Sequence, residues 1–145
     1  MKRLGVKMRK FVAIEVGPRS SMELDVEGRW LVRWGVPITI RGFKFFFIPM
    51  ANPKNVRIEA YSLDSLKTFD RFHISHEVAW KGCSTEEGFI RTVMPFITRI
   101  DKRLDNLDDD GWKTVFRDEY ISAIAQCGAR NKKEAKLLED FKKRK

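Results

Sequence analysis

The sequence predicts an α+β fold, in which the first half of the chain forms an antiparallel meander sheet of four to six strands and amphipathic helices of the second half pack on it. Three observations support this. Apolar residues alternate at period two in the first half, turn-forming residues separate these runs, and apolar residues recur at helical spacing after residue 84. With 145 residues and no linker rich in Pro, Gly or Ser, we expect a single domain spanning residues 1–145.

Alternation and glycine mark the first strands. Residues 11–16 are apolar at most positions and are followed by Gly17-Pro18, which ends a strand. Residues 29–34 alternate, so Trp30, Val32 and Trp34 share one face. Residues 36–41 alternate again, and we expect Gly35 to separate two strands.

An aromatic strand follows at residues 43–48, after Gly42, which the pattern leaves open as a turn or a bulge. Its alternating phenylalanines resemble a stacking platform for bases, but only Lys44 supplies positive charge there. We therefore interpret the row as core. Turn-forming residues at 51–55 predict a hairpin with a strand at 56–61.

The two histidines of the chain, His73 and His76, come at the end of a further strand predicted at residues 68–74. In a continuous strand they point to opposite faces, so we expect no joint metal site. His76 shares parity with Phe72 and Ile74, which predicts a core-facing, hydrogen-bonded imidazole.

His73-Ile74-Ser75 matches one H-x-S unit of the two-histidine phosphoesterase family, which this chain resembles in length. That family needs two such units, and His76 is followed by Glu77-Val78 instead. The resemblance makes His73 the candidate acid or base of a small phosphodiesterase or nuclease.

The second half begins with Ser84-Thr85-Glu86-Glu87, which fits a helix-capping box that starts at Ser84. A stripe at helical spacing follows and predicts a helix packed on one face of the sheet. The stripe consists of Phe89, Ile90, Val93, Phe96, Ile97, Ile100 and Leu104.

An acidic loop at residues 105–111 precedes a second helix that ends at Gly128. The loop lacks the alternating carboxylates of a calcium-binding EF-hand, so we interpret its acids as favourable charge at a helix N-terminus. Asn131 is placed to cap a third, strongly charged helix. Buried candidates in the second helix are Trp112, Val115, Phe116, Ala123 and Ile124.

The net charge of +9 is concentrated at the two ends of the chain. A basic N-terminal arm at residues 1–10 carries five basic side chains and no acid, and a basic C-terminal helix and tail occupies residues 131–145. Such ends either keep a protein soluble or contact nucleic acid through its phosphates. The candidate nucleic-acid-binding residues are Lys2, Arg3, Lys7, Arg9, Lys10, Lys142, Lys143, Arg144 and Lys145.

The composition bears on the cellular location of the protein, the state of its cysteines and its need for a cofactor. The longest apolar run is far shorter than the roughly 20 residues that cross a bilayer, which predicts a cytoplasmic protein without a membrane partner. Cys83 and Cys127 have no C-x-x-C partner, so we expect two reduced thiols. Nothing in the sequence calls for a cofactor or a metal ion.

The order Phe72-His73-Ile74-Ser75-His76, then Gly82, then a capped helix reaching Leu104 resembles the strand–turn–helix organisation of small phage early proteins. This resemblance implies a non-catalytic protein, encoded by a phage or mobile element, that binds and blocks a host or defence-system macromolecule in the host cytoplasm. It is our leading hypothesis. The alternatives are a DNA- or RNA-binding protein that uses its basic termini and an enzyme that uses His73.

Overall fold

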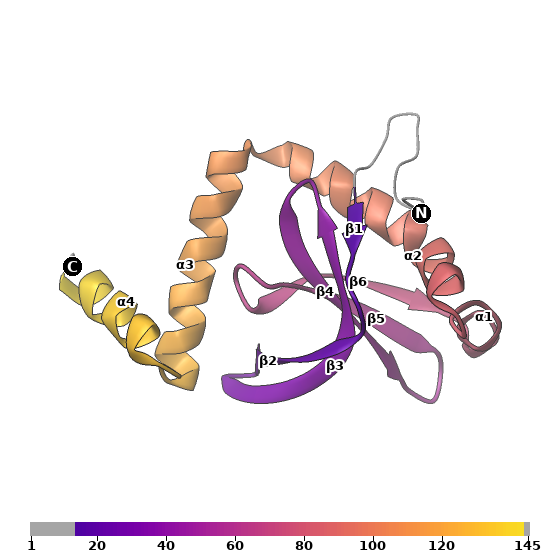
Figure 1. The fold of residues 1–145 in the computed structure, drawn as a ribbon, viewed down its shortest axis with the longest axis horizontal. Coiled ribbons are helices and arrows are strands. Elements are labelled where there is room, and N and C mark those ends of the chain that lie inside the picture. The colour runs from indigo at the N-terminus through magenta and orange to yellow at the C-terminus, as the bar shows by residue number, and fades with distance from the viewer. Residues whose placement is uncertain (1–13, 144–145) are drawn as a thin grey trace.

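A computed structural model describes residues 14–143, and within them antiparallel strands come first and helices follow, which confirms the α+β prediction (Figure 1). The strands are β1 (Ile14–Val16), β2 (Ser20–Val26), β3 (Arg29–Ile40), β4 (Phe43–Ala51), β5 (Val56–Ser62) and β6 (Lys67–Ile74). The helices are α1 (His76–Gly82), α2 (Glu86–Arg103), the short 3-10 turn η1 (Leu104–Asn106), α3 (Asp109–Cys127) and α4 (Lys132–Lys143). None of these helices is long and apolar enough to cross a membrane.

From β2 to β6 consecutive strands pair as antiparallel hairpins, which gives the predicted meander, and β1 pairs with β3. Two-residue turns at Glu27-Gly28 and Arg41-Gly42 join β2 to β3 and β3 to β4. All four turn residues have positive φ, between 53° and 83°. Positive φ at both central positions defines the type I′ turn, whose twist matches that of the flanking strands. Gly42 is therefore a turn residue rather than a bulge.

β3 changes partners halfway along its length. Its residues 29–35 pair with β2, whereas residues 36–40 pair with β4 and residues 38–40 pair with β1. The prediction that Gly35 separates two strands was wrong, because Gly35 lies inside one strand that curves, as Figure 1 shows. A Cβ at Gly35 would stand 2.5 Å from the carbonyl oxygen of Phe47, so this position needs glycine.

The main core lies between one face of the sheet and α2. Phe43, Phe45 and Phe47 all point to this face and are buried, which confirms the interpretation of the aromatic row as core. The ring centroids of Phe47 and Phe96 of α2 are 5.2 Å apart. Every member of the predicted stripe is buried against the sheet: Phe89, Ile90, Val93, Phe96, Ile97, Ile100 and Leu104.

A second cluster fills the inside of the curl, on the opposite side of β4. It joins the β2–β3 hairpin to β4, β5 and one residue of α3. β2 was not predicted, although Met22, Leu24 and Val26 alternate and give a weak signal for it. The buried members of this second cluster are Leu24, Phe46, Ile48, Tyr61, Leu66 and Ala123.

The helix boundaries follow local capping interactions. Thr85, not the predicted Ser84, caps α2 by accepting a hydrogen bond from the Gly88 amide at 3.0 Å. Asp108 caps α3 in the same way, so acidic loop residues do serve a helix N-terminus as predicted. Asn131 caps α4, and Gly128 ends α3 with a φ of 99°.

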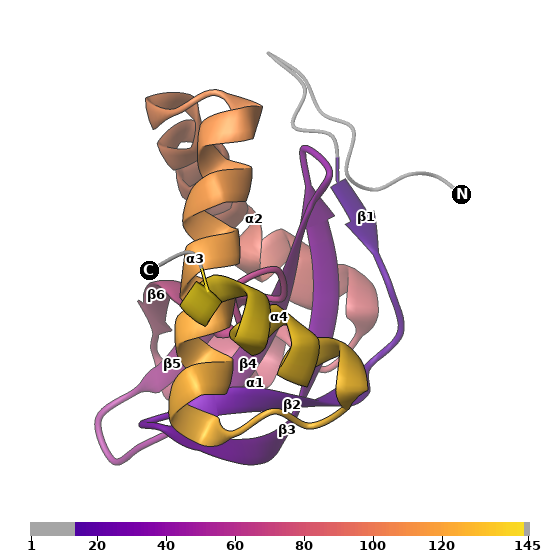
Figure 2. The same ribbon diagram turned by 90° about the vertical axis from the view of Figure 1, so that its left-hand side faces the viewer.

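α4 lies beside α3, as Figure 2 shows. A buried carboxylate joins the two helices. Glu134 is only 2% exposed, and its carboxylate accepts hydrogen bonds from the Tyr120 hydroxyl at 2.6 Å and from the Arg130 guanidinium at 2.6 Å. The hydrogen bonds from Arg130 outweigh the effect of burial and lower the pKa of Glu134 from 4.5 to about 2. Arg130 also stacks over Trp30, 3.9 Å from its ring centroid, which ties the helices to β3.

The Glu134 network predicts a loss of stability in acid. Since the pKa of Glu134 is depressed in the folded state, its contribution is complete above about pH 4.5 and is lost as pH falls towards about 2. The contribution is on the order of 3 kcal/mol. Chemical denaturation should therefore show a falling free energy of unfolding across this window in the wild type. The Glu134→Gln variant should be less stable at neutral pH and change less in acid, whereas exposed Glu139→Gln should behave like the wild type.

The bend in β3 predicts a penalty for any side chain at Gly35. Gly35→Ala should lower the free energy of unfolding by roughly 2 kcal/mol, because the methyl group must push the Phe47 carbonyl away. Gly28→Asn is the matched control, since nothing lies within 4 Å of a Cβ there and asparagine tolerates positive φ. An equal loss in the two variants, measured by denaturant titration, would contradict this role for Gly35.

Candidate functional site

The edge of β4 lacks a neighbouring strand over its last residues. Pairing with β3 stops at Val36 opposite Phe47, whereas pairing with β5 continues to Ala51. Residues 48–51 therefore have a strand on one side only. Pro49 lies in this stretch and has no N–H to offer, so the open edge is a poor template for adding another strand.

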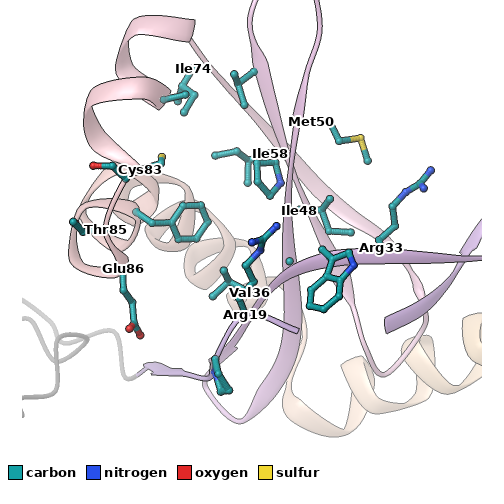
Figure 3. A pocket seen from close by; sticks show the side chains of 18 of the residues that line it. Arg19, Arg33, Val36, Ile48, Met50, Ile58, Ile74, Cys83, Thr85 and Glu86 are labelled. Atoms are coloured by element: carbon teal, nitrogen blue, oxygen red, sulfur yellow. The ribbon is translucent and has the colours of Figure 1, made fainter. Parts of the chain in front are cut away.

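A groove of about 930 Å³ lies between this open edge and the segment that joins α1 to α2 (Figure 3). Charged and polar side chains stand at its rim, with Arg19 and Arg33 from the strand side and Thr85 and Glu86 from the helix side. Its floor is apolar and comes from β3, β4, β5, β6 and α2. The floor residues are Val36, Ile48, Met50, Ile58, Ile74 and Phe89.

Large apolar side chains remain exposed to solvent on β3 and α1, two elements that each contribute lining residues to the groove. On β3, Trp34 is 58% exposed and Val32 is 57% exposed, and both line the groove. On α1, Trp80 is 83% exposed and Val78 is 46% exposed. Such clustering matters because isolated exposed apolar residues are ordinary, whereas a group beside an apolar hollow marks a binding surface.

The predicted face of β3 that carries its two tryptophans is only partly covered. Trp30 lies under Arg130 and donates its indole N–H to the Gly128 carbonyl at 2.7 Å. Trp34 has the Arg19 guanidinium 5.6 Å from its ring centroid and is 58% exposed. The connection between α3 and α4 therefore covers one end of this face, and the other end stays open at the groove.

The inner face of the curl carries a second polar feature, which we call the arginine face: Arg33, Arg57 and Arg71 around Glu59. Glu59 is 4% exposed and lies between two ion-paired arginines, with Nε of Arg57 at 2.8 Å and Nε of Arg71 at 3.3 Å. Strand register places all of them on one face, because Ile48 pairs with Glu59 and Glu59 pairs with Arg71. Thr68 donates a longer hydrogen bond to Glu59, at 3.4 Å.

Arg33 belongs to both the groove and the arginine face. Its pairing partner Met22 packs in the second cluster, so Arg33 points to the inner side of the curl. Its Nε is buried, and within residues 14–143 no hydrogen bond or ion pair satisfies its guanidinium. It lies within electrostatic reach of Tyr61: burial raises the pKa of Tyr61, nearby Glu59 adds to the increase and Arg33 opposes it.

The structure describes two of the nine nucleic-acid-binding candidates, and their role stays a prediction. Lys142 and Lys143 are exposed at the end of α4. The remaining seven residues lie outside the part of the chain that the structure describes: Lys2, Arg3, Lys7, Arg9, Lys10, Arg144 and Lys145.

The two histidines are separated by the end of β6. His73 is exposed and pairs with Arg57 across the strands, which places it beside the arginine face. The prediction that His76 faces the core was wrong, because Ser75 ends the strand and caps α1, so strand parity does not continue. His76 is exposed. The predicted hydrogen bond of its imidazole is present, because its Nε2 lies 2.7 Å from the Asn52 carbonyl oxygen.

The described cysteines are poor nucleophiles. Burial, with help from Asp25, raises the pKa of Cys127 to about 11, and burial also raises the pKa of Cys83 at the groove. Both thiols are therefore protonated at neutral pH, when reactivity requires a thiolate. Among residues 14–143, no three metal-ligating side chains come together.

Sequence reasoning missed Trp34 as a surface residue and the arginine face as a unit. Arg33, Arg57 and Arg71 are far apart in the chain, and each alternates with apolar residues as any surface-facing strand residue does. The one available signal was Glu59, a carboxylate between Ile58 and Ala60 in a strongly apolar strand. No known protein family, curated protein or solved structure matches the chain.

The arginine face predicts that Glu59 is required for stability. Glu59→Gln should lower the free energy of unfolding by roughly 2 kcal/mol, because Arg57 and Arg71 lose the charge that compensates them. The same substitution at exposed Glu27, in the β2–β3 turn, should change stability by less than about 0.5 kcal/mol. Equal denaturation midpoints for the two variants would contradict the compensating role of Glu59.

Proposed function

We propose that this protein is a non-catalytic binding protein that attaches to another protein through the groove. One observation carries the proposal: an apolar hollow of about 930 Å³ is lined by exposed Trp34 and Val32, and helix α1, which contributes Ala79 to that lining, carries exposed Val78 and Trp80. Following the resemblance to phage early proteins, the partner is a host or defence-system protein that the bound chain blocks. The proposal places the protein in the cytoplasm, in keeping with its two free cysteines.

The exposed tryptophans offer enough apolar surface for recognition. Burying Trp34 and Trp80 removes on the order of 300 Å² from water, worth about 7 kcal/mol before the costs of association are met. Tryptophan and arginine are also the side chains that most often dominate binding energy at protein interfaces. Arg19 and Arg33 at the groove rim add a charged component that favours an acidic partner.

The groove favours recognition of side chains over strand addition. Strand addition requires a row of free N–H and C=O groups, and Pro49 interrupts that row on the open edge of β4. The apolar floor instead suits side chains that project into the hollow. An apolar segment with acidic neighbours is therefore the partner chemistry that we propose.

Nucleic-acid binding is the second candidate, favoured by the three guanidiniums of the arginine face and by Lys142 and Lys143. Phosphodiester cleavage has less support. Among the described residues His73 has no second histidine beside it, since His76 lies at the start of α1 and contacts Asn52. General acid–base cleavage needs a second group to stabilise or protonate the reacting oxygens.

The proposal predicts that capture of a protein partner depends on Trp34 in the groove and on Trp80 of the adjoining helix α1. Immobilised wild-type protein, incubated with bacterial lysate, should retain a specific protein after nuclease treatment. The double variant Trp34→Ser/Trp80→Ser should retain at least about tenfold less of it, which corresponds to about 1.4 kcal/mol. Leu107→Ser is the control, because Leu107 is an exposed apolar residue that does not line the groove. Capture that nuclease abolishes, or that the double variant keeps, would contradict the proposal.

Removal of the basic ends should spare partner capture. Deleting residues 1–9 and 142–145 removes eight basic side chains but no residue of the groove. We expect the truncated chain to retain its partner and to associate more slowly at low salt. If duplex DNA were the partner, the slope of log affinity against log salt would instead fall by roughly 0.9 for each lost phosphate contact. Fluorescence anisotropy with labelled DNA across a salt series measures that slope.

A further inference from the structure

We propose that Arg33, Arg57 and Arg71 bind a phosphate-class dianion on the inner face of the curled sheet. This site is separate from the apolar floor of the groove and does not depend on a protein partner. Its ligand is a terminal phosphoryl group, either free inorganic phosphate or a phosphate monoester.

Charge balance is the first argument. Two guanidiniums pair with the Glu59 carboxylate, and the third, that of Arg33, has no carboxylate of its own, so the arginine face holds an excess of two positive charges. Asp70 and Asp25 are engaged elsewhere: Asp70 pairs with Arg99 of α2, with Nε 3.1 Å from the carboxylate, and Asp25 pairs with Lys67 at 3.1 Å. A phosphate monoester carries about −1.5 to −2 charges at neutral pH, so it matches the excess. A carboxylate or phosphodiester carries one charge and leaves the face under-compensated.

Free hydrogen-bond donors are the second argument. Each guanidinium has five N–H donors, and Glu59 engages only Nε of Arg71 and approaches Nε of Arg57. Arg57 gives one further donor to the Met50 sulfur at 3.4 Å. Within the described residues the Nη groups of Arg71 and the whole guanidinium of Arg33 have no partner. Phosphate oxygens accept such donors in pairs.

Preorganisation is the third argument. Glu59 is buried beneath the two arginines that it pairs with, and its position is set by strand pairing on both sides. It therefore restrains Arg57 and Arg71 before a ligand arrives, which reduces the entropy lost on binding. Arg71 is 56% exposed and leaves the face open to solvent, so a small anion has access.

The test measures stabilisation by inorganic phosphate at neutral pH against sodium chloride at matched ionic strength. Thermal unfolding of the full-length protein should give a saturable phosphate dependence, and the Arg57 and Arg71 Nε–H resonances should shift in NMR spectra. Arg33→Gln should weaken binding at least about tenfold. Arg29→Gln, which removes an exposed arginine of the same strand, should not. Phosphate also stabilises proteins by exclusion from their surface, but that effect is equal in both variants.

Two further arms identify the ligand chemistry. Dimethyl phosphate, a monoanion, should bind at least about tenfold more weakly than inorganic phosphate. Equal binding of the two, or tighter binding of a single-stranded oligonucleotide, would overturn the choice of a dianion in favour of a nucleic-acid backbone. Identical phosphate dependence in wild type and Arg33→Gln would overturn the site itself. Should Arg33→Gln not fold, exposed Arg71→Gln removes a guanidinium from the same site and carries the same expectation.

Discussion

The architecture depends on the separation of β3 from β4 at Gly35. Because glycine has no side chain, the Phe47 carbonyl can approach this point, and β3 can continue towards β2 instead of following β4. The curve encloses the second apolar cluster, leaves the last residues of β4 with one neighbour, and turns Arg33 to the inner face. The groove and the arginine face are both consequences of this single departure from a flat sheet.

The helices cover the sheet incompletely. The proposed binding surface is the part of the sheet that they leave exposed. α2 has one apolar stripe, which packs on the face formed by Phe43, Phe45 and Phe47. The connection between α3 and α4 covers Trp30 of the β2–β3 hairpin, through the Gly128 carbonyl and the Arg130 guanidinium. Figure 2 shows α3 ending beside this hairpin. Trp34 remains 58% exposed, so the middle of β3 stays open beside the groove.

Two buried carboxylates show how similar side chains give different surfaces. Glu134 is matched by one arginine, one tyrosine hydroxyl and a backbone amide, so its network is closed and stabilises the docking of α4. Glu59 compensates two arginines while a third, Arg33, has no partner in the described part of the chain. A closed network contributes to stability, whereas an unbalanced one keeps a capacity to bind anions.

Local patterns in the sequence determined the elements themselves. Alternation identified the strands from β3 to β6, helical spacing identified the buried stripe of α2, and Asn131 and Gly128 were identified as helix boundaries because capping depends on neighbouring residues. Only the tertiary structure decided which side of each strand is covered. Trp30 and Trp34 have the same parity, yet Arg130, 100 residues further along the chain, covers one and leaves the other exposed. Periodicity defines two faces of a strand, but their partners come from long-range packing, which a local pattern does not encode.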